Sequence, residues 1–65
     1  MKIDGVGLEI LKLLSEGKTV KEISKEIEVP YYRTVKIIYA LRLLYGAKNT
    51  TELVCKAMKQ ESETN

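Results

Sequence analysis

Residues 19–46 read TVKEISKEIEVPYYRTVKIIYALRLLYG, and this stretch contains the signals that decide the fold. Thr19 precedes Glu22 by three residues, which is the spacing of a capping box: each side chain accepts a hydrogen bond from the other residue's backbone N–H at the start of a helix. Pro30, the only proline, cannot continue a helix but suits the first turn of a new one. The stretch therefore predicts two helices joined by a tight turn, at residues 20–27 and 30–45.

The segment before this stretch predicts another helix, from about residue 6 to residue 16. Its apolar residues recur with helical spacing up to Gly17, a natural helix stop. They are Leu8, Leu11 and Leu14, with Ile10 and Leu13 widening the stripe.

After Gly46, which is placed to end the helix at 30–45, a fourth helix is indicated. Asn49 and Glu52 have the spacing of a second capping box, with asparagine at the cap. Its apolar side would consist of Leu53, Val54, Ala57 and Met58. Residues 61–65 contain no large apolar side chain and are expected to form a disordered polar tail. The fold class is therefore all-α, with one four-helix domain over residues 1–60 of the 65.

The helix at 30–45 divides into two faces when its residues are projected at about 100° each. The buried stripe is expected to contain Ile37, Ile38, Leu41, Leu44 and Tyr45, with Thr34 at its edge. The opposite face carries Tyr32, Arg33, Lys36, Tyr39, Ala40 and Leu43. Since one helix face cannot bury all of its apolar residues between 41 and 45, at least one should be exposed or contact another chain.

Two short helices joined by a tight turn, with polar and basic residues at the start of the second, form the helix-turn-helix arrangement. The major groove of DNA, about 12 Å wide, admits one helix whose outward side chains can contact base edges. We expect base contacts from Tyr32, Arg33, Lys36, Tyr39 and Ala40. Phosphate contacts are expected from Lys18, Thr19, Lys21, Lys25, Tyr31, Lys48 and Asn49. The net charge of +2 says little by itself, since the basic bias of this segment is modest.

Two sequence blocks carry a family resemblance. Residues 9–24 (EILKLLSEGKTVKEIS) and residues 46–54 (GAKNTTELV) are similar to the opening and closing parts of the LuxR/GerE-type helix-turn-helix domain, at the family's own separation. Pro30 stands where the family usually has serine, and Ile37 and Ala40 replace its frequent histidine and asparagine. An ungapped alignment places Thr34 at the family's buried valine. These departures bear on base preference rather than on the fold.

The resemblance implies a DNA-binding GerE-like domain that acts as a homodimer through its fourth helix. Val54, Met58 and Leu43 are the candidate dimer residues. For Val54 and Met58, closure of the chain's own core is an equally good interpretation. The chain would be a stand-alone member of the family, without a sensor domain.

Catalytic and cofactor chemistry are not indicated. The chain has no histidine, and a single cysteine with scattered carboxylates makes no zinc-like spacing. Cys55 is expected to be a small packing residue rather than a nucleophile. No cofactor, metal, small-molecule ligand or membrane partner is predicted. The single cysteine and the lack of a signal-peptide pattern favour a cytoplasmic location.

Two alternatives stay open. The surplus leucines and tyrosines would suit a helix-turn-helix-derived module that docks on RNA polymerase or another regulator without binding DNA. A winged-helix relative is less favoured, because the residues after Gly46 predict a helix rather than the two strands of a wing.

Overall fold

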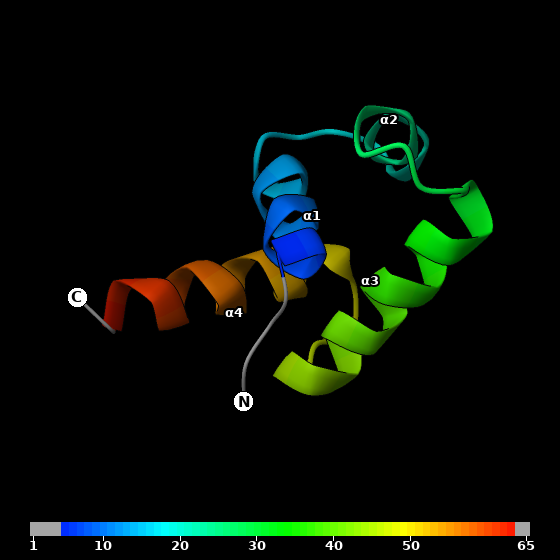
Figure 1. The fold of residues 1–65 in the computed structure, drawn as a ribbon. Coiled ribbons are helices and arrows are strands. Elements are labelled where there is room, and N and C mark those ends of the chain that lie inside the picture. The colour runs from blue at the N-terminus through cyan, green and yellow to red at the C-terminus, as the bar shows by residue number, and fades with distance from the viewer. Residues whose placement is uncertain (1–4, 64–65) are drawn as a thin grey trace.

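The computed structural model describes the backbone of residues 5–63 and the side chains of residues 5–60, and within this range it contains helices and no strands. The helices are α1 (Gly5–Ser15), α2 (Val20–Glu26), α3 (Tyr31–Tyr45) and α4 (Thr50–Glu63). Figure 1 shows α2 end-on above the other helices, α3 descending along one side, and α4 running beneath α1 to the opposite side. The expected all-α fold of four helices is confirmed.

The capping box that begins α2 is formed as expected. The backbone N–H of Glu22 donates to Thr19 Oγ1 at 3.2 Å, and the Thr19 N–H donates to Glu22 Oε1 at 2.8 Å. These hydrogen bonds, with the nearby charge of Lys18, lower the pKa of Glu22 below its ordinary value. The carboxylate stays ionised and continues to cap the helix at a pH where an ordinary glutamate would begin to take up a proton.

The start of α4 differs from the expected capping box in one bond. The Glu52 N–H donates to Asn49 Oδ1 at 2.8 Å, as predicted, but the Glu52 carboxylate accepts from the N–H of Lys48 at 3.2 Å rather than from that of Asn49. This bond and the nearby ammonium of Lys56, 3.4 Å away, lower the pKa of Glu52.

The fourth helix also continues to Glu63, three residues into the expected tail at 61–65, and residues 64 and 65 lie outside the described range. Pro30, expected as the first residue of the second helix, is instead the cap that precedes α3.

Helices α1, α2 and α3 end with the same left-handed turn, in which an N–H bonds to a carbonyl five residues earlier. The donors are Lys18, Val29 and Ala47, at 3.1, 3.1 and 2.8 Å from the carbonyls of Leu13, Ser24 and Arg42. The residue before each donor has a positive φ: 86° at Gly17, 57° at Glu28 and 67° at Gly46. Glycine adopts this conformation without strain, whereas a residue with a Cβ does so at a cost. Glu28 is therefore the strained residue of the turn between α2 and α3.

Replacing Glu28 with glycine is expected to raise the free energy of unfolding by about 1 kcal/mol, because the left-handed conformation costs an L-residue roughly 1–2 kcal/mol and glycine loses part of that gain in backbone entropy. Urea unfolding followed by circular dichroism measures the change. Glu28→Ala is the control, since it removes the same carboxylate but keeps the Cβ. If Glu28→Ala stabilised the protein equally, charge rather than backbone strain would be the cause.

The core lies where α1, α2, α3 and α4 meet. Ile10, Ile23 and Leu53 have no exposed surface, and each comes from a different helix. Around them are further buried residues: Leu11, Leu13, Leu14, Ile38 and Leu41. The half-buried side chains at the edge of the core are Val20, Ile27, Ile37, Tyr45, Ala47, Val54 and Ala57. Most of the apolar stripes expected from the sequence are confirmed.

Three side chains are more exposed than the sequence predicted. Leu8 is exposed because α1 turns Gly7, Ile10, Leu11 and Leu14 inward, which leaves position 8 at the outer edge. Leu44 is 37% exposed, because Leu41 and Tyr45 take the positions on α3 that face the core. Cys55 was expected to pack, and it is exposed instead: it follows the fully buried Leu53 by two residues, which in a helix places it on the opposite side.

Candidate nucleic-acid interface

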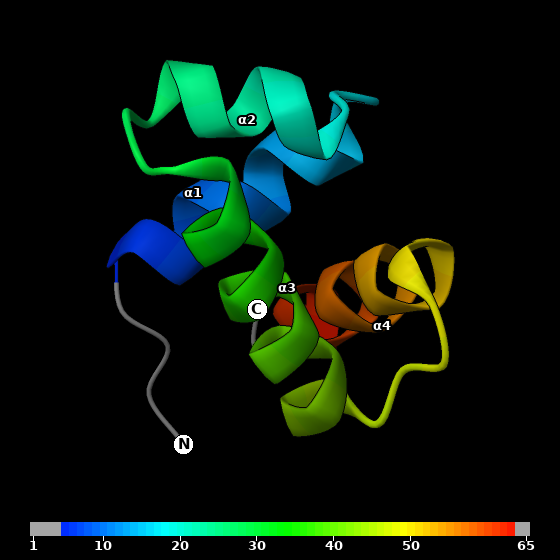
Figure 2. The ribbon, with the colours of Figure 1, turned by 90° about the vertical axis from the view of Figure 1, so that its right-hand side faces the viewer.

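Helices α2 and α3 are the two helices joined by a tight turn that the sequence predicts. Four residues, 27–30, connect them, and the two helices cross steeply in Figure 1. Thr34 fixes the start of α3: its side chain is fully buried, and its hydroxyl donates to the carbonyls of Pro30 at 3.1 Å and Val29 at 3.4 Å. In Figure 2, α3 lies in front of α1 and α4, and exposed side chains occur along its whole length.

All five residues expected to contact bases lie on the exposed side of α3: Tyr32, Arg33, Lys36, Tyr39 and Ala40. Leu43 continues the same face and is 67% exposed. The face is therefore a mixture of two cations with large apolar side chains. It confirms the expectation that part of the apolar content of this helix remains uncovered.

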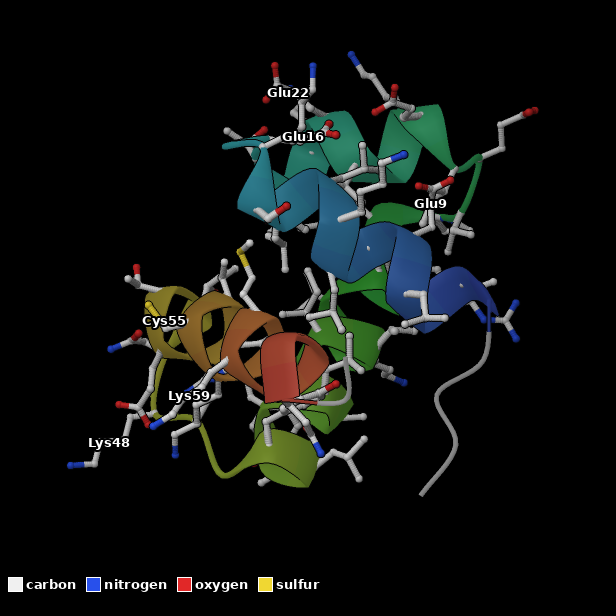
Figure 3. The ribbon with its side chains drawn as sticks, turned by 90° about the vertical axis from the view of Figure 1, so that its left-hand side faces the viewer. Glu9, Glu16, Glu22, Lys48, Cys55 and Lys59 are labelled. Atoms are coloured by element: carbon white, nitrogen blue, oxygen red, sulfur yellow. The ribbon has the colours of Figure 1, made fainter. Side chains whose placement is uncertain are left out.

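The charged side chains of α3 and of the loop that follows it are all basic. Residues 29–51 contain four basic residues and no acidic one, and the first turn of α3 has no carboxylate. Figure 3, seen from the side away from α3, shows Glu9 on α1 and Glu16 just after it, and also Lys48 and Lys59. A polyanion approaching this protein would therefore be attracted to α3, where no carboxylate opposes the basic side chains.

The expected phosphate-contacting residues flank α3. Figure 2 shows the start of α2 and the loop before α4 on the same side of α3. The residues expected to contact phosphate are all exposed: Lys18, Thr19, Lys21, Lys25, Tyr31, Lys48 and Asn49. Thr19 Oγ1 and Asn49 Oδ1 accept the capping hydrogen bonds of α2 and α4, so the hydrogens of the Thr19 hydroxyl and the Asn49 amide are left to donate.

Arg42, which the sequence did not single out, joins α3 to the loop before α4. Its Nη2 donates to the carbonyl of Lys48, and its guanidinium lies 6.0 Å from the ring centre of Tyr39. Its Nε is buried without a hydrogen-bond partner. Lys56 Nζ holds the same loop through the carbonyl of Gly46 at 2.9 Å. These contacts fix the backbone that carries Lys48 relative to α3. These contacts join side chains to backbone carbonyls that only folding brings close, so no pattern in the sequence could have predicted them.

The candidate dimer residues divide into two kinds. Val54 is half-buried and packs against the core of its own chain, whereas Met58 is 55% exposed and Leu43 more so. Val54 therefore helps to close the chain's own core, whereas Met58 does not and remains accessible.

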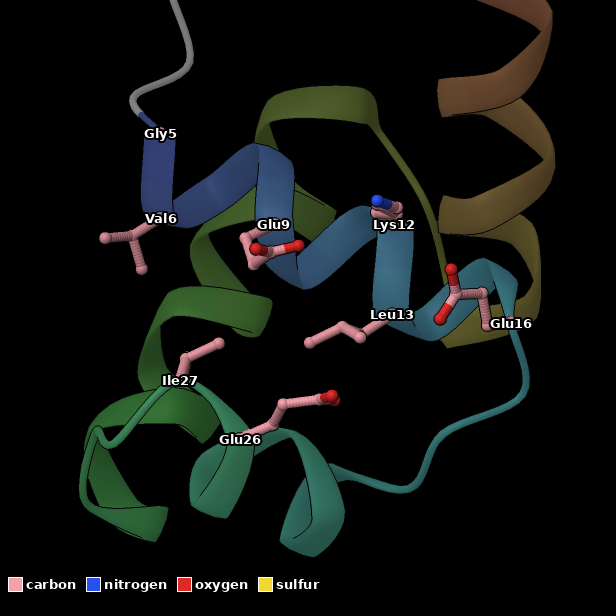
Figure 4. Close-up of a pocket in the computed structure, with 8 residues that line it drawn as sticks. All are labelled: Gly5, Val6, Glu9, Lys12, Leu13, Glu16, Glu26 and Ile27. Atoms are coloured by element: carbon pink, nitrogen blue, oxygen red, sulfur yellow. The ribbon is translucent and has the colours of Figure 1, made fainter.

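An open groove lies between α1 and α2, on a different side from the exposed face of α3. Figure 4 shows Leu13 and Ile27 pointing toward one another between the helices, with the side chains of Glu9, Lys12, Glu16 and Glu26 around the opening. Among the described residues no group of three or more histidine, cysteine or acidic side chains is placed to hold a metal ion.

No protein-family model matches this chain, and no significant match was found among curated proteins or solved structures. Within residues 5–63 no helix is both long enough and apolar enough to cross a membrane.

Proposed function

We propose that this protein is a sequence-specific double-stranded-DNA-binding transcription regulator that inserts α3 into the major groove. The observation that carries the proposal is the exposed face of α3, which combines Arg33 and Lys36 with a complete absence of acidic residues from position 29 to position 51. The helix-turn-helix pair that presents this face, and the resemblance of residues 9–24 and 46–54 to LuxR/GerE-type domains, support it further.

The proposed complex is a GerE-like homodimer on DNA, formed in the cytoplasm without a cofactor or catalysis. Its protein contact is made through α4, by Met58 and the uncovered edge of Val54, together with Leu43. A core built from a 65-residue chain is small, so a second subunit would add useful stability. The proposal requires two chains in each specific complex, which the stoichiometry of a DNA titration measures directly.

Titration of a fluorescently labelled duplex at several salt concentrations tests DNA binding. Each phosphate neutralised contributes about −0.9 to the slope of log affinity against log salt. The lysines at 18, 21, 25 and 48 would together give a slope of about −3.6 for each protomer. Absence of binding to any duplex at low salt would contradict the proposal.

A second candidate is a protein-interaction module that docks on RNA polymerase or another regulator. The observation in its favour is the apolar content of the exposed face, where Tyr32, Tyr39 and Leu43 are each more than half exposed. Aromatic and leucine side chains at helical spacing can also pack against a helix of a partner protein. A stable complex with a purified polymerase subunit, formed by a chain that binds no duplex, would favour this candidate.

A further inference from the structure

The geometry points to a specific class of DNA site: one in which α3 reads guanines followed by a thymine methyl group in the major groove. The inference rests on the proposed function and adds the base preference to it. Its basis is the set of chemical groups that the folded α3 leaves available for base contact.

The first step is to establish that Thr34 cannot contact a base. Thr34 is the only threonine, serine, asparagine or glutamine within α3, and it is fully buried with its hydroxyl bonded to the carbonyls of Val29 and Pro30. The helix contains no carboxylate. Carboxamides pair with adenine in the major groove, and carboxylates accept from the amino group of cytosine. The exposed face of α3 therefore has neither of the side-chain groups that usually select those two bases.

The second step concerns the groups that remain. Arg33, Lys36 and Ala40 are exposed and follow one another by three and four residues, so they form one row along the helix. Arginine and lysine donate to the N7 and O6 acceptors of guanine, and a small apolar side chain contacts the methyl group of thymine. The row therefore presents two guanine-selecting cations and then a methyl-contacting residue.

Tyr32 and Tyr39 border this row on the other side of the exposed face. The guanidinium of Arg42 lies over the Tyr39 ring, 6.0 Å from its centre, and Arg42 is itself bonded to the loop before α4. Because Arg42 lies over one face of the Tyr39 ring, this ring presents a defined apolar surface beside the row. That surface adds to the preference for thymine over a pyrimidine that lacks the methyl group.

The test uses the duplex that this protein selects most strongly from a random pool, resynthesised with modified bases. Replacing guanine by 7-deazaguanine removes the N7 acceptor, and replacing thymine by uracil removes the methyl group. Each change preserves Watson–Crick pairing. Fluorescence anisotropy at constant salt is expected to show roughly a tenfold loss of affinity for the first duplex. A loss of about fourfold for each contacted methyl group is expected for the second.

Protein variants assign the two effects to their residues. Arg33→Ala and Lys36→Ala should each reduce the penalty caused by 7-deazaguanine, and Ala40→Ser should reduce the penalty caused by uracil. Lys21→Ala is the matched control: it should weaken binding to all duplexes by the same factor and leave both penalties unchanged. Circular dichroism of each variant verifies that the helices are intact.

The outcomes separate this inference from the proposed function. Strong, salt-dependent binding that is unaffected by both modified bases would overturn the guanine–thymine preference while leaving DNA binding intact. Binding to no duplex of the pool at low salt would overturn both. A selected duplex whose affinity falls with both modified bases, and whose penalties shrink only in the α3 variants, would support the inference.

Discussion

Replacing Leu53 with alanine is expected to unfold a large part of this protein under conditions where the unchanged chain is folded. Leu53 has no exposed surface and occupies the position where α4 meets the core. A leucine-to-alanine change at such a site costs about 2–5 kcal/mol, through lost apolar burial and the cavity left behind. A 65-residue domain has a total stability of only roughly 3–10 kcal/mol, so the loss is a large fraction of the whole. Thermal unfolding followed by circular dichroism measures it.

Leu8→Ala provides the matched control for Leu53→Ala. The residue type and the substitution are the same, but Leu8 is 56% exposed at the outer edge of α1. Its replacement should change the free energy of unfolding by much less than that of Leu53. Equal losses from the two variants would show that α4 is not packed on the core as described.

Replacing Lys36 with alanine is expected to reduce affinity for a specific duplex by about tenfold to a hundredfold, the range that a specific contact of a cation with guanine supplies. Lys36 lies near the middle of the exposed face of α3, and alanine is a better helix former, so the fold should survive the change. The measurement is the dissociation constant for a selected duplex and for a scrambled one at the same salt concentration. Specific affinity should fall more than nonspecific affinity.

Lys59→Ala separates the position of the charge from the charge itself. Lys59 is an exposed residue of α4, and Figure 3 shows it on the side of the molecule away from α3. The substitution lowers the net charge by the same amount as Lys36→Ala. A comparable loss of specific affinity in both variants would mean that α3 is not the reading helix.

Local signals in the sequence were sufficient for most helix boundaries. The capping box of Thr19 and Glu22 depends on residues three apart, and Gly17 and Gly46 end helices because of their own conformational freedom. For the second capping box, only one of the two predicted hydrogen bonds forms. Asn49 caps α4 as expected, but the Glu52 carboxylate bonds to Lys48, since the backbone path of the preceding loop decides which N–H it can reach.

The faces of the helices were less predictable than the helices themselves. A period of 3.6 residues identifies an apolar side, but its exact centre depends on where the neighbouring helices lie. This is why Leu8 and Cys55, both apolar, are exposed, and why Val54 belongs to the core while Met58 does not. The left-handed conformation of Glu28 carried no signal either, because glutamate gives no indication of a positive φ.

The sequence by itself determined the four helices, the tight turn before α3 and the residues on the outward face of that helix, because capping, turn chemistry and helical periodicity act over a few neighbouring residues. Only the tertiary structure decided that Thr34 is fully buried with its hydroxyl bonded to the carbonyls of Val29 and Pro30, that Arg42 ties α3 to the loop before α4, and where Glu9 of α1 lies relative to α3. The physical reason is that burial and electrostatic asymmetry depend on how separate helices pack together, and no local pattern specifies that packing.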